Sequence, residues 1–505
     1  MRSPGRWAEP ALAVAALSAV GGALRLATSN QSVFADELAT YWIVSTHGFS
    51  DLFTVVHSDA EISPPLSFLA AWLTTRIDLT PELLRAPSLV AGLATIPGVY
   101  LVGARTAGRA AGLLAAALTT FSPFMIYYSS EARGYALAMA LVTFSTLAML
   151  VAAQRGRRRW WVAYGALSCA AMYTHYTCAF VLGFQLAWLM WVHPEARRAA
   201  LLTNVGAALA YLPWLSGLRA DLASPTTAIL SALQPFNPQA VKVSLVHWSV
   251  AYPYSIKPAS DLPGIPALIL LGAAVALGAG AVAGRRLRHG RVGPLAAEPR
   301  YAVLLVGLAL SVPVSAAVLS AIGSNLFSTR NLAASWPGFA LALAALLMSA
   351  GPRLRMVTAA MAVVAFAIGG LKLLETTNGR PQYEEVAKAI NRQTQPGDVV
   401  IDETAVISPG PLSHIDPFLD PRGAVFRSEQ PQQHVRPFSA LDMQVPPDTA
   451  ARKAVAAAHG RQIFLATDEG RARQKRPLGR YRLVQDHHYP GLIGLDLQVY
   501  ALPAS

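Results

Sequence analysis

The stretch SSEARGYALAMALVTFSTLAMLVAAQRGRRR, residues 129–159, decides the fold class. It opens with a short polar turn, continues through an apolar run over about 134–153, and ends in a cluster of arginines. An apolar run of about 20 residues is long enough to cross the hydrocarbon core of a bilayer as a helix. The stretch therefore predicts a transmembrane helix with a polar turn at one end and a basic loop at the other.

The same pattern repeats along most of the chain, which has 505 residues, 53% of them hydrophobic and 14% charged. Soluble domains carry about 25% charged residues, so most of this chain cannot face water. The high apolar content and the two cysteines exclude a disordered chain and a disulfide scaffold. We predict a polytopic α-helical membrane protein with about eleven spans, at 10–29, 83–104, 109–127, 134–153, 160–175, 177–193, 199–217, 262–284, 301–321, 331–350 and 355–374.

The formal charge of +13 arises from 41 Lys and Arg against 28 Asp and Glu. The basic residues lie in short clusters between apolar runs, which indicates membrane topology rather than a nucleic-acid partner. The clusters share one side if the N-terminus is cytoplasmic and if residues 63–79 lie as an interfacial helix in the first outer loop, 31–82. They are Arg105 with Arg109, Arg155 with Arg157 to Arg159, Arg197 with Arg198, the stretch 285–291, and Arg353 with Arg355.

The tail changes character after the last span and contains no further apolar run of that length. An odd number of spans places it on the extracytoplasmic side. Hydrophobic periodicity predicts a helix over 383–394, and short strands over 399–402 and 462–466. We therefore predict a transmembrane domain over 1–375 and a small α/β domain over 376–505.

Acids, bases and aromatic residues collect at the outer ends of the predicted spans. A charged residue in or beside a span is costly, so it indicates function by default. Asp36 and Glu37 follow the first span, and Glu61 lies later in the same loop. Later outer segments contribute Glu131, Arg133, Tyr135, His175, Tyr176, His247 and Arg330. This convergence predicts a site that opens to the outer side.

Each of these residues also has a structural interpretation. Asp36 and Glu37 could cap the end of a span, and Arg133 and Arg330 could reach lipid phosphates. His175 could be a hydrogen-bonded structural histidine. The adjacent His487 and His488 could bind a metal, but neighbours on an extended segment point to opposite faces, which favours a surface position. Taken one at a time, these residues do not decide between the structural and the functional interpretation.

In chain order, these motifs resemble those of the GT-C glycosyltransferases. The motifs are the Asp36-Glu37 pair beyond the first span, Pro64-Pro65-Leu66 at the start of a loop helix, the stretch Ser129 to Tyr135, the His175-Tyr176 turn, and Arg330 before a late span. The resemblance is strongest to the family 39-like group, which includes protein O-mannosyltransferases and aminoarabinose transferases. It covers roughly residues 10–375.

The resemblance implies transfer of a sugar from a polyprenyl-phosphate donor to an acceptor hydroxyl at the outer face of the membrane. The acceptor class, whether glycan, lipid or protein, stays open. In the family, the first acid of the pair is regarded as the base, and that position matches Asp36. The chain departs from the pattern before its Pro pair. There Ser63 and Ile62 replace the family's His or Lys and Glu, and the acid is Glu61.

The chemistry of such a transfer needs a base for the acceptor hydroxyl and positive charge for the departing phosphate. Asp36 is the candidate base, and Arg133 and Arg330 are the candidates for binding phosphate, because a guanidinium donates bidentately and stays charged. One displacement would invert the anomeric centre. A divalent metal ion is possible, since acidic loops bind such ions, but no ligand spacing demands one. The competing hypotheses are a lipid or sugar flippase or transporter, and a non-catalytic scaffold.

Overall fold

The computed structural model describes residues 5–34, 36–57, 61–224, 235–255, 261–289, 297–323, 325–404, 436–440, 443 and 445–503. The chain divides into two compact units. Unit 1 comprises Met1–Ser29, Ile62–Ala71 and Arg85–Leu374, and unit 2 comprises Asn30–Glu61, Trp72–Leu84 and Glu375–Ser505.

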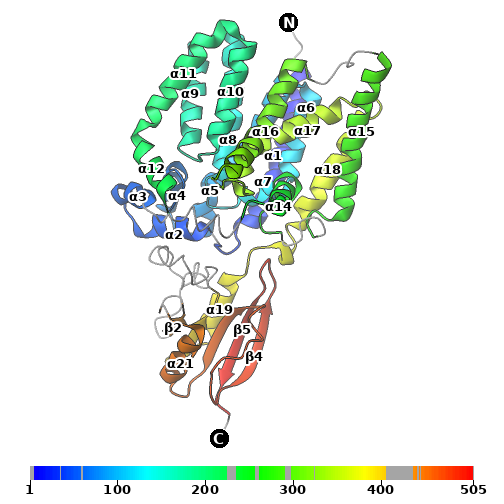
Figure 1. Cartoon of the computed structure of the whole chain (residues 1–505). Helices are drawn as coiled ribbons and strands as arrows, with labels where there is room; N and C mark the ends of the chain where they lie inside the picture. The colour runs from blue at the N-terminus through cyan, green and yellow to red at the C-terminus, as the bar shows by residue number, and fades with distance from the viewer. Residues whose placement is uncertain are drawn as a thin grey trace. The chain divides into compact units, whose positions relative to one another are not determined.

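Unit 1 is a bundle of helices, and each of the eleven predicted spans contains one (Figure 1). In Figure 1, α9, α10 and α11 form one flank of this unit, α15 and α18 form the other, and α1, α6, α8, α16 and α17 lie between them. The helices lying wholly or mostly in unit 1 are α1 (Gly5–Ser29), α4 (Leu66–Thr75), α5 (Pro81–Thr106), α6 (Arg109–Phe121), α7 (Pro123–Ser129), α8 (Tyr135–Arg155), α9 (Arg158–Met172), α10 (Cys178–Val192), α11 (Arg197–Tyr211), α12 (Leu215–Ala223), α14 (Pro238–Val250), α15 (Ile265–His289), α16 (Pro299–Ala321), α17 (Trp336–Met348) and α18 (Arg355–Lys372), with short 3₁₀ turns η1 (Pro194–Ala196), η2 (Leu212–Trp214) and η3 (Arg330–Ser335).

Eight helices of the described residues are long and apolar enough to cross a membrane, and α6 with α7 forms a ninth candidate, bent by 61°. The prediction of a polytopic α-helical membrane protein is confirmed. Helices α9 and α10 have 15 residues each, so they are about 22 Å long and shorter than the roughly 30 Å hydrocarbon core. Helix α4 has 10 residues and is shorter still, as a segment that does not cross would be.

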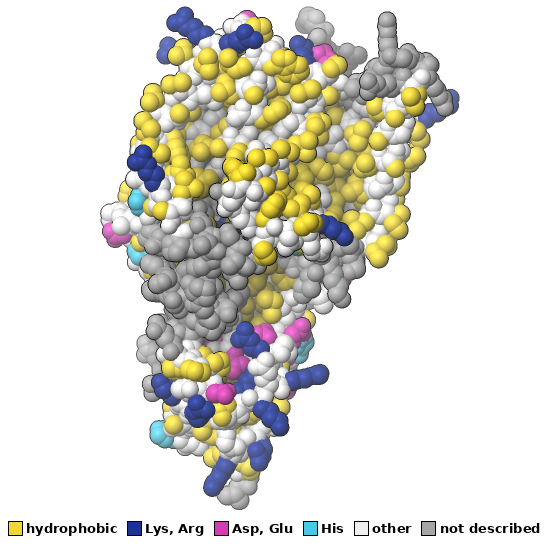
Figure 2. All heavy atoms as spheres, viewed as in Figure 1, with side chains coloured by type: hydrophobic (Ala, Val, Ile, Leu, Met, Phe, Trp, Pro, Cys, Tyr) yellow, Lys and Arg dark blue, Asp and Glu magenta, His cyan; other side chains and the backbone are white. Residues whose placement is uncertain are grey.

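Burial within unit 1 separates central helices from peripheral ones. The apolar windows of α8 and of η3 with α17 are 72% buried, whereas that of the α11–α12 region is 17% buried. The peripheral helices expose Leu and Val side chains, which suits contact with lipid. Figure 2 shows these hydrophobic side chains over the helical unit, with Lys and Arg side chains gathered along its upper edge. That arrangement is the one expected when basic loops share one side of a membrane.

Helices α5 and α6 approach each other closely through glycine. A Cβ atom placed on Gly103 would lie 2.6 Å from the Cα atom of Gly112. Small residues at such contacts let two helix backbones pack without a side chain between them, which is how membrane helices gain dispersion energy.

Unit 2 contains α2 (Glu37–Thr46), α3 (Phe49–Val56) and the tail domain. The tail has η4 (Thr376–Asn378), α19 (Tyr383–Gln393), α21 (Pro447–Ala458) and strands β1 (Val399–Asp402), β2 (Arg436–Ser439), β3 (Ile463–Asp468), β4 (Arg482–Tyr489) and β5 (Leu495–Ala501). The strands form one mixed sheet in the order β2-β1-β3-β5-β4, parallel at β2-β1-β3 and antiparallel at β3-β5-β4. The predicted α/β tail is confirmed.

The core of the tail lies between α21 and the parallel strands. Ala451, Ala454 and Ala458 of α21 pack with Val399 and Ile463 and with further apolar residues of the sheet. Alternate faces of a strand point in opposite directions, so these residues come from one face of the sheet. Strand β4, at the edge, is exposed along most of its length and carries His487 and His488. His488 Nδ1 lies 2.8 Å from Asp496 Oδ1.

Candidate active site

The site in unit 1 begins at the break between α6 and α7. Pro123 starts α7, and Ser122 caps it by accepting a hydrogen bond from the Met125 N–H at 3.3 Å. Proline has no N–H, so the carbonyl of Thr119, four residues earlier, loses its helical partner. The axis of α7 is therefore bent by 61° from the axis of α6, and α7 directs the segment that follows it away from the line of α6.

Arg25, fully buried in α1, supplies the donors that this break requires. Its Nη2 donates to the Thr119 carbonyl at 3.1 Å and its Nη1 to the Thr120 carbonyl at 3.3 Å. Its Nε donates to Ser129 Oγ at 3.0 Å, at the far end of α7. One guanidinium therefore fixes both ends of α7, and with them the start of the turn that follows.

That turn, between α7 and α8, carries Glu131 and Arg133. Both side chains are almost fully buried, although they are among the most polar in the chain, and buried charges of this kind need partners. Arg133 Nη2 donates to Ser63 Oγ at 3.2 Å, and its guanidinium lies 5.3 Å from the centre of the Phe68 ring. Ser88 Oγ donates to the Arg133 carbonyl at 3.1 Å. The turn is thus held from three sides.

His175 lies in the turn between α9 and α10, with its ring 5.5 Å from that of Tyr135. Its Nδ1 accepts from the Thr177 N–H at 3.3 Å, which leaves the neutral ring with its proton on Nε2. Burial of the ring lowers its pKa to about 4, and the positive charges of Arg133 and Arg330 act in the same direction. The two arginines, far apart in sequence, therefore act on the same imidazole.

Arg330 begins η3, and its neighbour Thr329 places Oγ1 3.5 Å from His247 Nδ1. His247 is buried, and its Nε2 lies 2.9 Å from the Ser255 carbonyl oxygen, to which it donates as the neutral ring. Burial lowers the His247 pKa, against the opposing effect of that hydrogen bond. His247 thus adjoins Arg330 through Thr329.

Aromatic rings connect these groups. Tyr135 packs against Tyr128 at 4.6 Å between ring centres, Tyr128 against Tyr127 at 5.5 Å, and Tyr127 against Tyr254 at 5.7 Å. The Tyr128 hydroxyl lies within electrostatic range of both Glu131 and Arg330. Unit 1 therefore brings Glu131, Arg133, Tyr135, His175, His247 and Arg330 into one neighbourhood.

Tyr176 makes different contacts, although it follows His175. Its hydroxyl hydrogen-bonds to the Asp221 carboxylate and accepts from Trp214 Nε1 at 3.1 Å. Burial and the hydrogen bond to Asp221 both raise the Tyr176 pKa. In this structure the hydroxyl therefore ties the turn to α12, and its predicted contact with a substrate stays a prediction.

The predicted acids of the first outer loop belong to unit 2. Asp36, partly buried, occupies the N-cap position of α2, but its side chain makes no capping hydrogen bond there. Glu37 is fully buried and forms an ion pair with Arg380 at 2.6 Å. Glu37 Oε2 also accepts from the Phe34 N–H at 3.2 Å. Glu61, later in the same loop, is buried as well.

Three residues of these sites could not be identified from the motifs. Arg25 lies inside a predicted span, and a lone arginine in an apolar run is the signal that could have identified it. Ser63 stands out in the sequence only as a departure from a motif, although it contacts Arg133. Arg380 gives no signal, because its partner Glu37 lies 343 residues away in the chain. In the described part of the chain, no group of three or more His, Cys, Asp and Glu side chains is arranged to hold a metal ion.

Comparison with known proteins gives one family match. Residues 63–217 match the family model described as dolichyl-phosphate-mannose-protein mannosyltransferase. That segment runs from Ser63 through the Glu131–Arg133 turn and His175 to α12. No curated protein sequence matches the chain.

Solved structures match the chain over nearly its full length. ArnT from Cupriavidus metallidurans in the apo state has a TM-score of 0.56 and 13% identity, covering 98% of both chains. The same protein bound to undecaprenyl phosphate has a TM-score of 0.53 and 12% identity, covering 100% of this chain and 99% of the other. The Archaeoglobus fulgidus oligosaccharyltransferase tethered to an acceptor peptide with the NVT sequon has a TM-score of 0.50 and 11% identity, covering 91% and 69%. At these identities the similarity concerns the fold.

Proposed function

We propose that this chain, a multi-pass membrane protein with the GT-C fold, is a glycosyltransferase that takes its sugar from a polyprenyl-phosphate donor. The observation that carries the proposal is that Arg133, His175 and Arg330 share one neighbourhood in unit 1, where the His175 ring lies 5.5 Å from that of Tyr135 and within electrostatic range of both arginines. Two guanidinium groups close enough to act on one imidazole form a region of positive charge suited to a phosphate. The match to a structural relative in complex with undecaprenyl phosphate supports this class of donor.

The two arginines would stabilise the charge that develops on the departing phosphate. In a site with little water, fixed donors are worth more than in bulk solvent, because the local dielectric constant is low. The phosphate leaves as a stable anion, so no acid has to protonate it. A neutral His175 with a proton on Nε2 can donate a further hydrogen bond to the phosphate, and it adds no positive charge that would repel Arg133 and Arg330. Glu131 would orient Arg133 or accept from a sugar hydroxyl.

Asp36 is the proposed base. Its carboxylate would take the proton of the acceptor hydroxyl as the oxygen forms a bond to the anomeric carbon, while the bond from that carbon to the phosphate oxygen breaks. One positioned base contributes about 10² to 10⁴ in rate. A single displacement inverts the anomeric configuration. Trapping of a covalent glycosyl-enzyme, for example with a fluorinated donor analogue and mass spectrometry, would contradict this step.

We place the reaction at the outer face of the membrane, with the N-terminus in the cytoplasm and the tail outside. The arginine clusters between spans support this orientation by the positive-inside rule. A lipid-linked donor suits such a site, because its tail stays in the bilayer while its head is met at the interface. Glycan, lipid and protein hydroxyls are all candidate acceptors.

A flippase or transporter is the competing hypothesis. Transporters place their charged groups near the bilayer midplane, where they bind the substrate. In the first span, Arg25 instead donates to the carbonyls of Gly21, Thr119 and Thr120 and to Ser129. This guanidinium is used to hold the fold, so it gives the transport hypothesis no support.

The decisive experiment incubates membranes containing the protein with a panel of radiolabelled polyprenyl-phosphate sugars and identifies what becomes labelled. We expect Asp36→Asn to abolish labelling, and Arg133→Gln and Arg330→Gln to lower it by at least about tenfold through loss of charge-assisted contacts. The matched controls are Asp51→Asn on the exposed turn of α3 and Arg198→Gln on the exposed start of α11, and both should retain wild-type transfer. Donor movement between leaflets without Asp36-dependent labelling would favour the flippase.

A further inference from the structure

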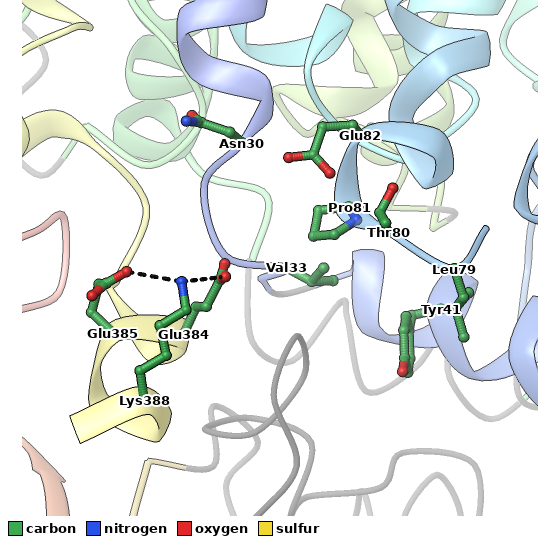
Figure 3. A pocket seen from close by; sticks show the side chains of 10 residues that line it. All are labelled: Asn30, Val33, Tyr41, Leu79, Thr80, Pro81, Glu82, Glu384, Glu385 and Lys388. Carbon is green, nitrogen blue, oxygen red and sulfur yellow. Dashed lines mark hydrogen bonds and ion pairs between the residues drawn. The ribbon is translucent and has the colours of Figure 1, made fainter. Parts of the chain in front are cut away.

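Unit 2 contains a pocket with a volume of about 450 Å³ that the proposed chemistry does not use. Small-molecule sites commonly have volumes of about 300 to 1,000 Å³. The walls come from the loop after α1, from the start of α5 and from α19. Figure 3 shows the Lys388 ammonium between the carboxylates of Glu384 and Glu385, with Glu82 apart from this group and next to Pro81.

The lining combines hydrogen-bond donors, acceptors and a small apolar floor. Asn30 and Lys388 offer N–H donors, and Glu82, Glu384 and Glu385 offer carboxylate acceptors. Val33 and Pro81 add apolar atoms. A sugar has hydroxyl groups that both donate and accept, together with C–H faces that pack on apolar atoms. A prenyl chain would remove solvent from these carboxylates and the ammonium and offer them no hydrogen bond in return, which is costly.

The charge of the pocket selects among hydrophilic ligands. Lys388 Nζ lies 2.7 Å from Glu384 Oε1 and 3.2 Å from Glu385 Oε1. The hydrogen bond to Glu384 and, after it, Glu385 raise the Lys388 pKa, so the ammonium stays charged at neutral pH. The lining contains one ammonium and three carboxylates, so its net charge is negative. A phosphate or a uronic acid would be repelled there, and the donor phosphate is thereby excluded as its occupant.

The pocket adjoins the loop of the proposed base. Val33 lines it and stands three residues before Asp36, and three residues span at most about 11 Å. This wall is held in place within unit 2. The Arg380 N–H donates to Gln31 Oε1 at 3.1 Å, and the Glu384 N–H donates to Ser32 Oγ at 3.0 Å. A ligand in the pocket would therefore contact the preorganised loop that carries Asp36, at Val33.

We propose that this pocket binds a neutral, hydroxyl-rich glycan, and that this glycan is the acceptor of the transfer, which rests on the proposed function. Carboxylates at Glu82, Glu384 and Glu385 accept from its hydroxyls, and Asn30 and Lys388 donate to its oxygens. Phospholipid headgroups and acidic glycans are poor ligands because of the net charge.

The test measures glycan binding directly, without turnover, on the purified full chain in nanodiscs by saturation-transfer NMR and calorimetry. The probes are mannotriose as the neutral glycan and trigalacturonate as the anionic one. We expect mannotriose to bind and trigalacturonate not to bind. Lys388→Met and Glu82→Gln should each weaken mannotriose binding by about tenfold, as loss of a charged hydrogen-bonding partner does. Lys453→Met and Asp448→Asn on the exposed face of α21 are the matched controls and should bind as wild type does.

A charge reversal keeps the test informative if a loss-of-binding variant is poorly folded. Glu82 is exposed, so Glu82→Lys should fold, and we expect it to gain binding of trigalacturonate. Equal mannotriose binding by wild type, Glu82→Gln and Lys388→Met overturns the glycan site, as does a wild type that binds neither probe. Mannotriose binding at this pocket in a protein that shows no Asp36-dependent transfer supports the glycan site and overturns the transferase. Asp36-dependent transfer by a protein that binds no mannotriose would support the transferase and overturn the glycan site.

Discussion

The Arg380 guanidinium and the Glu37 carboxylate meet at 2.6 Å inside unit 2, where neither side chain exposes more than 3% of its surface. The pair joins α2, the first helix of the outer loop over 31–82, to the segment that precedes α19. Removing one member of a buried pair leaves an uncompensated charge, whereas the intact pair roughly balances its own desolvation. The contact therefore ties Asp36, the neighbour of Glu37, to the integrity of the tail domain.

Glu37→Gln should destabilise the protein by about 3 to 5 kcal/mol, because it removes the carboxylate charge that lies against the buried Arg380 guanidinium. The double variant Glu37→Gln with Arg380→Gln should recover part of this loss. Thermal unfolding in detergent, followed by circular dichroism, measures both. Glu298→Gln removes an exposed partner of Arg300 and is the control, with an expected effect below about 0.5 kcal/mol. Equal shifts for Glu37→Gln and Glu298→Gln would show that the buried pair is not formed.

Arg25→Met should lower both stability and sugar transfer. The variant strands the carbonyls of Thr119 and Thr120, at about 1 to 3 kcal/mol for each buried unsatisfied group, and it releases Ser129 at the start of the site turn. Arg25→Lys should be intermediate, since an ammonium has donors but no planar fork. The readouts are the unfolding midpoint and kcat against the donor KM. Arg105→Met, at the exposed end of α5, is the control. Normal kcat in a folded Arg25→Met would mean that Arg25 does not position the turn.

His175 makes stability fall in acid. Its pKa is about 4 in the folded protein, against an ordinary value of 6.5 for a solvated imidazole, so between these two values the unfolded chain binds more protons. The contribution is fully present above pH 6.5 and is lost as the pH falls towards 4. We expect the unfolding midpoint of wild type to decline more steeply than that of His175→Gln over this window. Parallel pH profiles for the two proteins would rule out a buried neutral imidazole.

Tyr176→Phe should cost about 1 to 3 kcal/mol, because it removes the hydroxyl shared by Asp221 and Trp214 in a partly buried site. Tyr173→Phe is the matched control. Its hydroxyl donates to the Ala210 carbonyl at 3.1 Å in an exposed position, and water can replace that bond. Thermal unfolding of the two variants makes the comparison, and a larger loss for Tyr173→Phe would contradict the contact with Asp221.

Hydropathy alone predicted the membrane helices well, because lipid requires long apolar runs and each residue contributes to the average. The structural matches confirm the fold that the resemblance implied. The break at Pro123 was not predicted, since the run over 109–127 stays apolar on both sides of it. Helix 383–394 and strand 399–402 were predicted closely. Strand β4 was missed, because it is exposed on both faces and shows no alternation.

For the site, the sequence predicted which residues matter far better than it predicted their contacts. The residues could be identified from the sequence, because charges beside apolar runs are rare and costly. Their partners could not, since contacts such as Arg133 with Ser63 or Arg25 with Ser129 join residues about 70 to 104 positions apart. Local sequence patterns do not predict which turn packs against which helix. Tyr176 illustrates the limit, because its neighbour His175 lies beside Tyr135 whereas Tyr176 contacts α12.

The close approach of Gly103 and Gly112 also bears on the order of assembly. Helix α5 ends at Thr106 and α6 begins at Arg109, so the two helices are joined by a very short loop and meet next to it. Closing so short a loop loses little chain entropy. The pair can therefore form as a helical hairpin soon after synthesis, before α17 is made, and offer the later helices a template on which to pack.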